Sequence, residues 1–361
     1  MAEILHPRPS PLAAAMYTMR DLDAEVIIIH GPSGCSFKPA RLLEKDGIRV
    51  LTTALSDQDF VFGGEGKLVN ALKRADELFH PRLIGVVGTC ASMIIGEDLR
   101  KAARNAGLEE KTICCDVHSG SGDNTVGAVM VLKEACQKGL ISKAEFERQK
   151  AMLEMATEVE KARGTARDEY LDTAPGDSPA SVARAIIETM KGGGHVTCVL
   201  NAKKETVFLY ADLILAMAAV GRKLGVPFET IANLDPEVGL PRIRGYAAEV
   251  LGEFQRAGCA VDVTTGGLDE YPLAGMRARD HLLAHPPDLA VVSGIPHAVA
   301  VEGRIRSAAV TVGTRATFNL KSLGYDMVVA ERDAHSVSLG VGKKVRGSFL
   351  GAALRREVQC R

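Results

Sequence analysis

The first 140 residues of the chain alternate between short apolar runs and longer segments with apolar residues at helical spacing. The apolar runs predict strands at 26–30, 48–55, 83–89 and 112–117. The helical spacing predicts helices at 38–47, 67–79, 96–107 and 124–139. Strands that are apolar throughout, each followed by a helix, are typical of a parallel sheet covered on both faces.

The pattern changes after residue 139 and then returns. Residues 140–191 are rich in Ala, Glu, Lys and Arg and predict two helices without a strand. A second alternating stretch predicts strands at 195–200, 227–234, 260–265 and 289–294, with helices at 206–224 and 243–257. The remaining residues are Gly-rich and less periodic, and residues 301–361 hold 11 Lys and Arg against 5 Asp and Glu.

These patterns predict an α/β protein of two to three Rossmann-like domains with parallel sheets. We expect an N-terminal α/β domain over 1–139, a helical connection over 140–191, a second α/β domain over 192–295 and a basic C-terminal α/β segment over 296–361. The 36 glycines among 361 residues suit a fold with many tight turns between strands and helices.

Composition excludes several classes of function. The net charge is −1 and aromatic residues make up 4%, which argues against nucleic-acid binding. The most apolar stretch, 206–221, is too short for a membrane span and contains Asp212. The opening residues MAEILHPRPSPL lack the basic start and apolar stretch of a secretion signal, so we expect a cytoplasmic protein with reduced thiols.

Two cysteines stand where ligands are usually bound, just after predicted strands of a parallel sheet. Cys35 lies in HGPSGC after the first strand, and Cys90 lies in GTCASM after the third. Thiolates in such loops suit a soft metal or an iron–sulfur cluster. A 4Fe-4S cluster usually needs four ligands, so two cysteines per chain would require a symmetric homodimer. Each cysteine is equally well explained as a small buried residue or a chance loop residue.

Other titratable residues carry weaker predictions. Three histidines lie near predicted strand ends and are candidate proton donors or axial ligands, although a structural role is more common: His118, His297 and His335. The basic end either faces a polycarboxylate ligand or an acidic partner, or is solvated surface. The remaining cysteines are predicted to be structural: Cys114, Cys115, Cys136, Cys198, Cys259 and Cys360.

Three motifs in order resemble the nitrogenase component 1 family: HGPSGC (30–35), SDQDFVFGGEGKL (56–68) and GTCASMIIGEDL (88–99). The family's cysteines map onto Cys35 and Cys90, and its acidic helix start maps onto Glu97 and Asp98. The resemblance covers about the first 140 residues. FGGEGKL lacks the spacing of a phosphate loop, which agrees with ATP chemistry on a partner.

The resemblance implies a nitrogenase component 1-like fold and a mechanism. A nitrogenase-reductase-like ATPase with its own 4Fe-4S cluster would hydrolyse ATP and pass single electrons to a 4Fe-4S cluster, one per homodimer, held by Cys35 and Cys90 of both chains. Residues 1–29 lack the family's third cluster cysteine, which favours this cluster over an eight-iron one. The short chain is similar to the branch that reduces a nickel tetrapyrrole and closes a γ-lactam in coenzyme F-430 biosynthesis.

Three alternatives remain open from the sequence. The chain could be a subunit of a protochlorophyllide- or chlorophyllide-type reductase, which pairs two different chains. It could be a non-catalytic scaffold for metallocluster assembly, or a metal-free nucleotide-binding α/β enzyme. The sequence also leaves open whether a carboxylate replaces a cysteine ligand, the candidates being Glu97, Asp98 and Asp116.

Overall fold

A computed structural model describes residues 10–118, 120–166, 170–332 and 343–359. The chain forms two compact units, and each is described by itself. The first unit comprises Pro7–Glu154 with Leu240–Arg242, and the second comprises Met155–Gly239 with Ile243–Arg361. The division falls inside one helix, α8 (Lys143–Ala162).

The first unit is built on a four-stranded parallel sheet with the order β2-β1-β3-β4. Its strands are β1 (Val26–His30), β2 (Arg49–Thr52), β3 (Ile84–Gly88) and β4 (Thr112–Cys115). Every residue of β1, β3 and β4 is buried, as their unbroken apolar runs predicted, whereas β2 is partly exposed. The sheet therefore has β1 and β3 at its centre.

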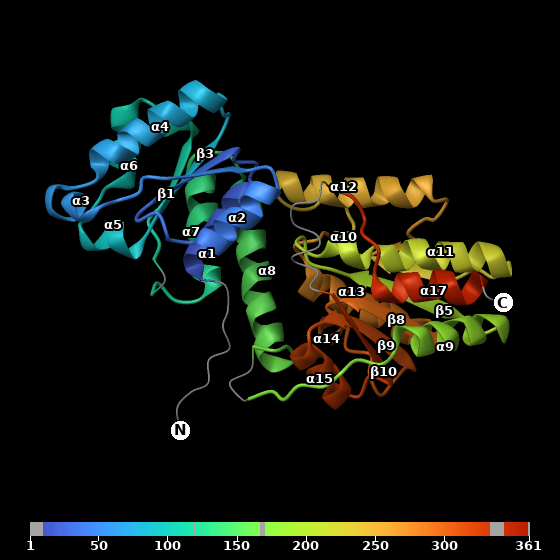
Figure 1. Cartoon of the computed structure of the whole chain (residues 1–361). Coiled ribbons are helices and arrows are strands. Elements are labelled where there is room, and N and C mark those ends of the chain that lie inside the picture. Colours follow the sequence, from blue (N-terminus) through green and yellow to red (C-terminus); the bar gives the residue numbers. More distant parts are fainter. Residues whose placement is uncertain (1–9, 119, 167–169, 333–342, 360–361) are drawn as a thin grey trace. The chain divides into compact units, whose positions relative to one another are not determined.

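Helices cover both faces of this sheet (Figure 1). On one face lie α4 (Glu65–Phe79) and α6 (Leu99–Ala106), whose Leu68, Leu72 and Ala102 pack on the side chains of β1 and β3. On the other lie α1 (Pro11–Asp21) and α7 (Asn124–Gln137), which contact each other, with α1 against β3 and α7 against β4. The shorter elements are α2 (Phe37–Lys45), α3 (Asp57–Phe62), α5 (Cys90–Ile94) and a 3-10 turn at Glu109–Lys111.

The second unit contains a six-stranded parallel sheet with the order β10-β9-β8-β5-β6-β7. Its strands are β5 (Val196–Asn201), β6 (Glu229–Ala232), β7 (Val263–Thr264), β8 (Leu289–Gly294), β9 (Ser307–Val312) and β10 (Met327–Glu331). The last two strands come from the segment that we predicted to be a separate basic part. They extend the sheet of the preceding α/β unit.

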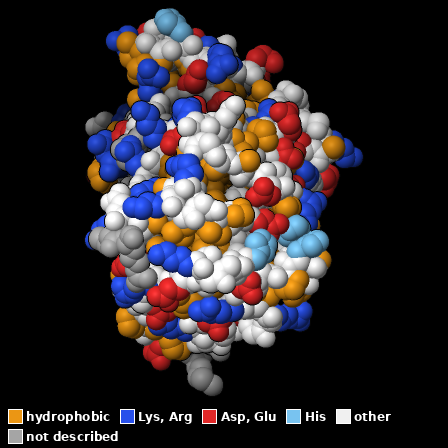
Figure 2. Space-filling model, turned by 90° about the vertical axis from the view of Figure 1, so that its right-hand side faces the viewer, with side chains coloured by type: hydrophobic (Ala, Val, Ile, Leu, Met, Phe, Trp, Pro, Cys, Tyr) orange, Lys and Arg blue, Asp and Glu red, His pale blue; other side chains and the backbone are white. Residues whose placement is uncertain are grey.

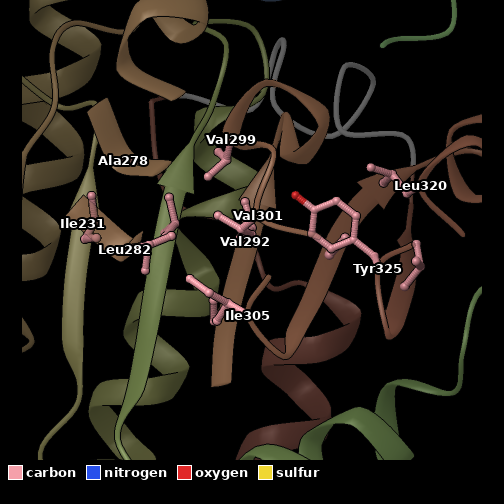
Figure 3. Close-up of a cluster of buried hydrophobic side chains, with 13 residues drawn as sticks. Ile231, Ala278, Leu282, Val292, Val299, Val301, Ile305, Leu320 and Tyr325 are labelled. Carbon is pink, nitrogen blue, oxygen red and sulfur yellow. The ribbon is translucent and has the colours of Figure 1, made fainter. Parts of the chain in front are cut away.

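The helices of the second unit pack on both faces of that sheet. They are α9 (Pro179–Lys191), α10 (Val207–Tyr210), α11 (Asp212–Leu224), α12 (Pro241–Arg256), α13 (Tyr271–Ala284), α14 (Pro296–Val299), α15 (Thr314–Leu323) and α17 (Phe349–Gln359). Figure 3 shows the core on one face, where Val292 of β8 lies close to Val301 and Tyr325. Each fully buried Leu or Ile stabilises such a core by about 1.5–3 kcal/mol.

The α/β class with parallel sheets is confirmed, and most predicted elements lie within a few residues of their observed bounds. The predicted strand at 289–294 has those bounds, and Gly107 caps α6 in a left-handed conformation with φ 73°. The helix predicted over 206–224 is instead two helices, α10 and α11, joined at Ala211. Asp212 is the first residue of the second helix, and its carboxylate accepts hydrogen bonds from Ser348 and Arg355.

Surface charge is mixed where the sequence predicted a basic end. Lys321 pairs with Asp177, and Arg315 and Lys343 lie over the rings of Tyr170 and Tyr246. On the face shown in Figure 2, basic and acidic side chains are interspersed, with apolar patches between them. Within the part of the chain that the structure describes, no helix is both long and apolar enough to cross a bilayer.

Candidate metal centre

The order of the strands in the first sheet reverses between β1 and β3. The chain leaves β1 toward β2 on one side, while β3 and β4 continue on the other. The last residues of the two central strands, His30 and Gly88, are partners in register. The loops that follow them therefore start side by side at the carboxyl edge, the place where doubly wound sheets bind ligands.

These two loops carry the predicted cysteines. Cys35 is half-buried in the loop after β1, and its backbone N–H donates to the carbonyl of Pro32 at 3.0 Å. Cys90 is exposed and is the first residue of α5, so it begins a helix and does not lie within the loop as we predicted. Thr89 caps that helix, and its hydroxyl donates to the carbonyl of His30 at 3.0 Å.

This last hydrogen bond holds the two loops against each other. The approach is close enough to require a glycine at Gly31, because a Cβ there would lie 2.4 Å from Oγ1 of Thr89. Gly31, the first glycine of the HGPSGC motif, therefore allows the Cys90 helix to start beside the Cys35 loop. The backbone places both thiols on one edge of the sheet.

The two thiols also interact electrostatically. Burial raises the pKa of the Cys35 thiol, and the neighbouring Cys90 thiol raises it further. A second negative charge nearby disfavours ionisation of the first, so both influences favour the protonated form of the Cys35 thiol in the absence of a cation. A bound metal cation would reverse this effect and stabilise both thiolates.

A buried histidine–carboxylate pair supports the same edge. Nε2 of His30 lies 3.3 Å from Oε2 of Glu97, and its Nδ1 lies 3.0 Å from the Thr53 hydroxyl. Oε1 of Glu97 accepts a hydrogen bond of 2.6 Å from the backbone N–H of Gly64. Burial lowers the pKa of His30, with Glu97 acting against that shift. Four segments of the chain therefore meet at this one pair.

The acidic residues that we considered as substitute ligands have different environments. Both carboxylate oxygens of Glu97 have partners in that pair, and Asp98 accepts the backbone N–H of Lys101 as the cap of α6. Asp116 follows β4, and burial raises the pKa of its carboxyl group. Among the described residues, no three His, Cys, Asp or Glu side chains form a group that could hold a metal ion. A cluster with four protein ligands would thus draw on more than these two cysteines.

Large apolar side chains surround the cysteine edge and are exposed. Phe62 at the end of α3 is 86% exposed, and Ile94 at the end of α5 is 74% exposed. Exposed apolar side chains gathered on a protein surface mark an interaction site. The others are Phe37, Phe60, Val61 and Met93. We call these six residues the apolar rim. The apolar rim was not predicted from the sequence. The run FVF before two glycines did indicate apolar residues outside any predicted strand.

Among the described residues, His118 is the predicted histidine that belongs to the same unit as the cysteines. His118 follows β4, where its Nδ1 accepts a hydrogen bond from the backbone N–H of Gly120 in its own loop. His297 belongs to the second unit, in α14. His335 and Cys360 lie outside the described residues. The other cysteines are spread over separate elements, with Cys114, Cys115 and Cys198 buried in strands.

Comparison with known proteins extends these observations. The model of the family "Nitrogenase component 1 type Oxidoreductase" matches residues 10–165. Component CfbD of the Ni-sirohydrochlorin a,c-diamide reductive cyclase complex of Methanothermobacter thermautotrophicus is 51% identical over 98% of this chain and 99% of its own. Its counterpart from Methanosarcina acetivorans is 44% identical over 98% of this chain and 96% of its own. The nitrogenase molybdenum-iron protein alpha chain of Clostridium pasteurianum is 38% identical over 28% of this chain and 21% of its own.

Proposed function

Since the chain belongs to the family of component CfbD of the Ni-sirohydrochlorin a,c-diamide reductive cyclase complex, among the nitrogenase component 1-type oxidoreductases, we propose that it is the catalytic component of such a complex. Its substrate would be Ni-sirohydrochlorin a,c-diamide. The reaction would reduce the ring and close an acetamide side chain into the γ-lactam of seco-F-430. The observation that carries this proposal is 51% identity over 98% of the chain.

Cys35 and Cys90 would hold an iron–sulfur cluster. Their thiols interact with each other, and they follow the two central strands of one sheet. This arrangement fits half of the four-cysteine set that a 4Fe-4S cluster takes. A second copy related by a two-fold axis would bring the same two cysteines and complete the set. The thiols would lose their protons on binding, because cluster iron stabilises thiolates.

A 4Fe-4S cluster bound there would accept and pass on single electrons. The residues around it have other tasks. Thr89 and Gly31 keep the two cysteine loops in contact, so the thiols stay at a fixed separation. The apolar rim would be covered by the second copy, and that coverage would exclude water from the thiolates. The His30–Glu97 pair would keep the edge rigid from behind.

The electrons would come from a separate nitrogenase-reductase-like ATPase that carries its own 4Fe-4S cluster. The absence of a phosphate loop from FGGEGKL (62–68) supports placing ATP hydrolysis on that partner. The nickel tetrapyrrole is the substrate of the complex, so nickel enters with it and is not a resident metal of this chain.

The first test is the iron and sulfide content of anaerobically purified protein of known oligomeric mass. We expect about two irons per chain in a homodimer. Cys35→Ala and Cys90→Ala should each lose the iron, whereas Cys136→Ala, which removes a half-buried helical thiol, should keep it. Wild-type protein that stays folded and metal-free after reconstitution would refute the cluster.

The second test is turnover with the ATPase partner, ATP and Ni-sirohydrochlorin a,c-diamide. Activity of the homodimer alone with the reductase would exclude a reductase built from two different chains. Transfer of the cluster to an acceptor protein, without consumption of the tetrapyrrole, would instead identify an assembly scaffold. Loss of turnover in Cys35→Ala with substrate binding intact would assign the thiols to electron transfer.

A further inference from the structure

The six-stranded sheet of the second unit has its own reversal of strand order, between β5 and β8. The loop after β5 carries Lys203, and the loop after β8 leads into α14 with His297. Both residues therefore stand at the carboxyl edge where a doubly wound sheet binds its ligand. The proposed function assigns no role to this edge.

Glu160, near the end of α8, connects the two loops. Its Oε1 accepts hydrogen bonds from Nζ of Lys203 at 2.8 Å and from the hydroxyl of Tyr271 at 3.2 Å. Its Oε2 lies 3.5 Å from Nε2 of His297. With Oε1 occupied by two donors, the carboxylate is held with Oε2 directed at the imidazole. This is the arrangement of a histidine acid–base group oriented by a carboxylate.

The charge state of the carboxylate suits this role. Burial alone would raise the pKa of Glu160, but Lys203 and His297 together hold it well below its usual range. Glu160 therefore stays ionised at every physiological pH. An ionised neighbour stabilises the imidazolium form of a histidine, which is the form that can donate a proton.

The backbone of His297 is fixed from two further elements. The guanidinium of Arg163 donates to the carbonyl of His297 at 3.0 Å, and Glu302 forms an ion pair with Arg163. The hydroxyl of Tyr325 donates to the carbonyl of Pro296 at 2.8 Å. The ring thus stays in place while it gains and loses protons. Arg163, Glu302 and Tyr325 therefore join Glu160, Lys203 and Tyr271 as titratable groups near His297.

One buried polar atom at this edge points to a ligand. Oδ1 of Asn201, the last residue of β5, has no hydrogen-bond partner among the described residues. Buried polar atoms are rarely left unpaired, so an atom without a partner calls for a ligand or an ordered water. Access is available, because the side chain of Lys203 is 35% exposed while that of His297 is 11% exposed.

We propose that His297 donates protons to the tetrapyrrole as its ring is reduced, on a substrate held at the carboxyl edge between β5 and β8. Glu160 is the positioning residue for His297. Lys203, whose ammonium is fixed by Glu160 and lies 4.7 Å from the centre of the Tyr271 ring, binds a carboxylate side chain of the substrate. This inference rests on the proposed function.

Reduction of one ring double bond takes two electrons, supplied one at a time by the iron–sulfur reductase partner, and two protons. One proton comes from His297: its N–H bond breaks and a C–H bond forms at a ring carbon. The second proton comes from water. His297 is left as neutral imidazole beside the Glu160 carboxylate and takes up a new proton from solvent.

The test compares this pair with a matched pair at the opposite edge of the same sheet. His281 and Glu229 form a histidine–carboxylate contact of 2.8 Å, and Glu229 is the first residue of β6. We expect His297→Asn to slow turnover roughly 10²–10⁴-fold while iron content and tetrapyrrole binding stay at wild-type values. His281→Asn should leave all three unchanged.

The positioning role of Glu160 has its own readouts. A general acid acts only while protonated, so removing the carboxylate that positions it should change the pH profile of turnover. Glu160→Gln should change that profile and lower kcat, with KM for the tetrapyrrole near its wild-type value. Glu229→Gln should change neither.

Lys203→Met should raise KM for the tetrapyrrole with a smaller effect on kcat, whereas Lys204→Met in the same loop should not. Wild-type turnover together with an unchanged rate and pH profile in His297→Asn would overturn the inference and leave the proposed function standing. A wild-type complex that never consumes the tetrapyrrole would overturn the proposed function, and the inference with it. Thermal melting of Glu160→Gln, which preserves side-chain shape, checks that lost turnover is not lost folding.

Discussion

The two units use the same arrangement of strands to position different chemical groups. In each, a parallel sheet reverses its strand order between two central strands, β1 and β3 in the first unit and β5 and β8 in the second. In each, the loops after those strands meet at the carboxyl edge. The first edge carries two thiols and the second carries a lysine, a carboxylate and a histidine. One suits electron transfer and the other proton transfer.

The surroundings of the two edges also differ, in how exposed their side chains are. The cysteine edge is bordered by the apolar rim and has an exposed thiol at Cys90, as a surface that another chain covers would have. At the edge of the second sheet the titratable groups are mostly buried and hydrogen-bonded to one another. The fold supplies two ligand positions, and the residues after each strand decide what each position does.

The largest effect expected is a complete separation of the two chemistries by substitution. Cys35→Ser or Cys90→Ser should abolish both bound iron and turnover. His297→Asn should slow turnover and keep the iron. Iron analysis and turnover assays on the same preparations check this. A loss of iron in His297→Asn would contradict the view that the two edges work separately.

Much of the first edge could be predicted because its information is local. Short apolar runs locate the strands, and Cys35 and Cys90 follow them within a few residues. The adjacency of β1 and β3 could not be derived, because pairing between parallel strands depends on how the helices pack. The apolar rim was missed because α3 and α5 are too short for helical periodicity to be recognised.

The second edge could not be predicted from the sequence, for a different reason. His297 was a weak candidate, but Glu160, Lys203 and Tyr271 were not considered at all. They lie far apart along the chain, and the end of α8 brings Glu160 to the sheet. Nothing in a run of Ala, Glu, Lys and Arg distinguishes the one glutamate that becomes buried. Strands β9 and β10 were missed although SAAVTV and MVVAE are short apolar runs like those of the predicted strands.

A second prediction compares one glycine from each edge. A Cβ on Gly294, the last residue of β8, would lie 2.3 Å from the backbone carbonyl oxygen of Asn201, and its φ is +100°. Gly294→Ala should therefore cost roughly 3 kcal/mol or more in unfolding free energy. Gly31→Ala meets the side chain of Thr89 and should cost about 1–3 kcal/mol. Denaturant titration measures both.

The matched control for that pair is a second substitution. Thr89→Ala should recover part of the stability lost in Gly31→Ala, because the clash is with a side chain. No side-chain change can relieve Gly294→Ala in the same way, since its clash is with backbone. Equal costs for the two glycines would show that the loops of the second edge adapt more than their geometry indicates.

A third prediction tests the apolar rim against an exposed apolar residue of the second unit. Ile94→Asp should raise the dissociation constant of the proposed homodimer at least about tenfold, because it places a charge where the second copy would bury apolar surface. Met276→Asp changes a residue on α13 that is 42% exposed and should leave the dimer intact. Analytical ultracentrifugation over a range of concentrations distinguishes them. Equal effects would remove the special role of the rim.

The smallest effect expected comes from His30. Burial lowers its pKa below the ordinary 6.5, so the folded protein holds this ring neutral while the unfolded chain can protonate it. Its contribution to stability is therefore complete above pH 6.5 and is lost as the pH falls below that value, by at most about 1.4 kcal/mol per pH unit. Unfolding free energies at pH 7.5 and 5.5 should show the loss in wild type and a smaller one in His30→Gln. His281→Asn should behave as wild type, since the argument for His30 is its complete burial. If His30→Gln loses as much unfolding free energy as wild type between these two pH values, the acid sensitivity comes from other residues. His30 would then not be a buried neutral histidine next to the cysteine edge.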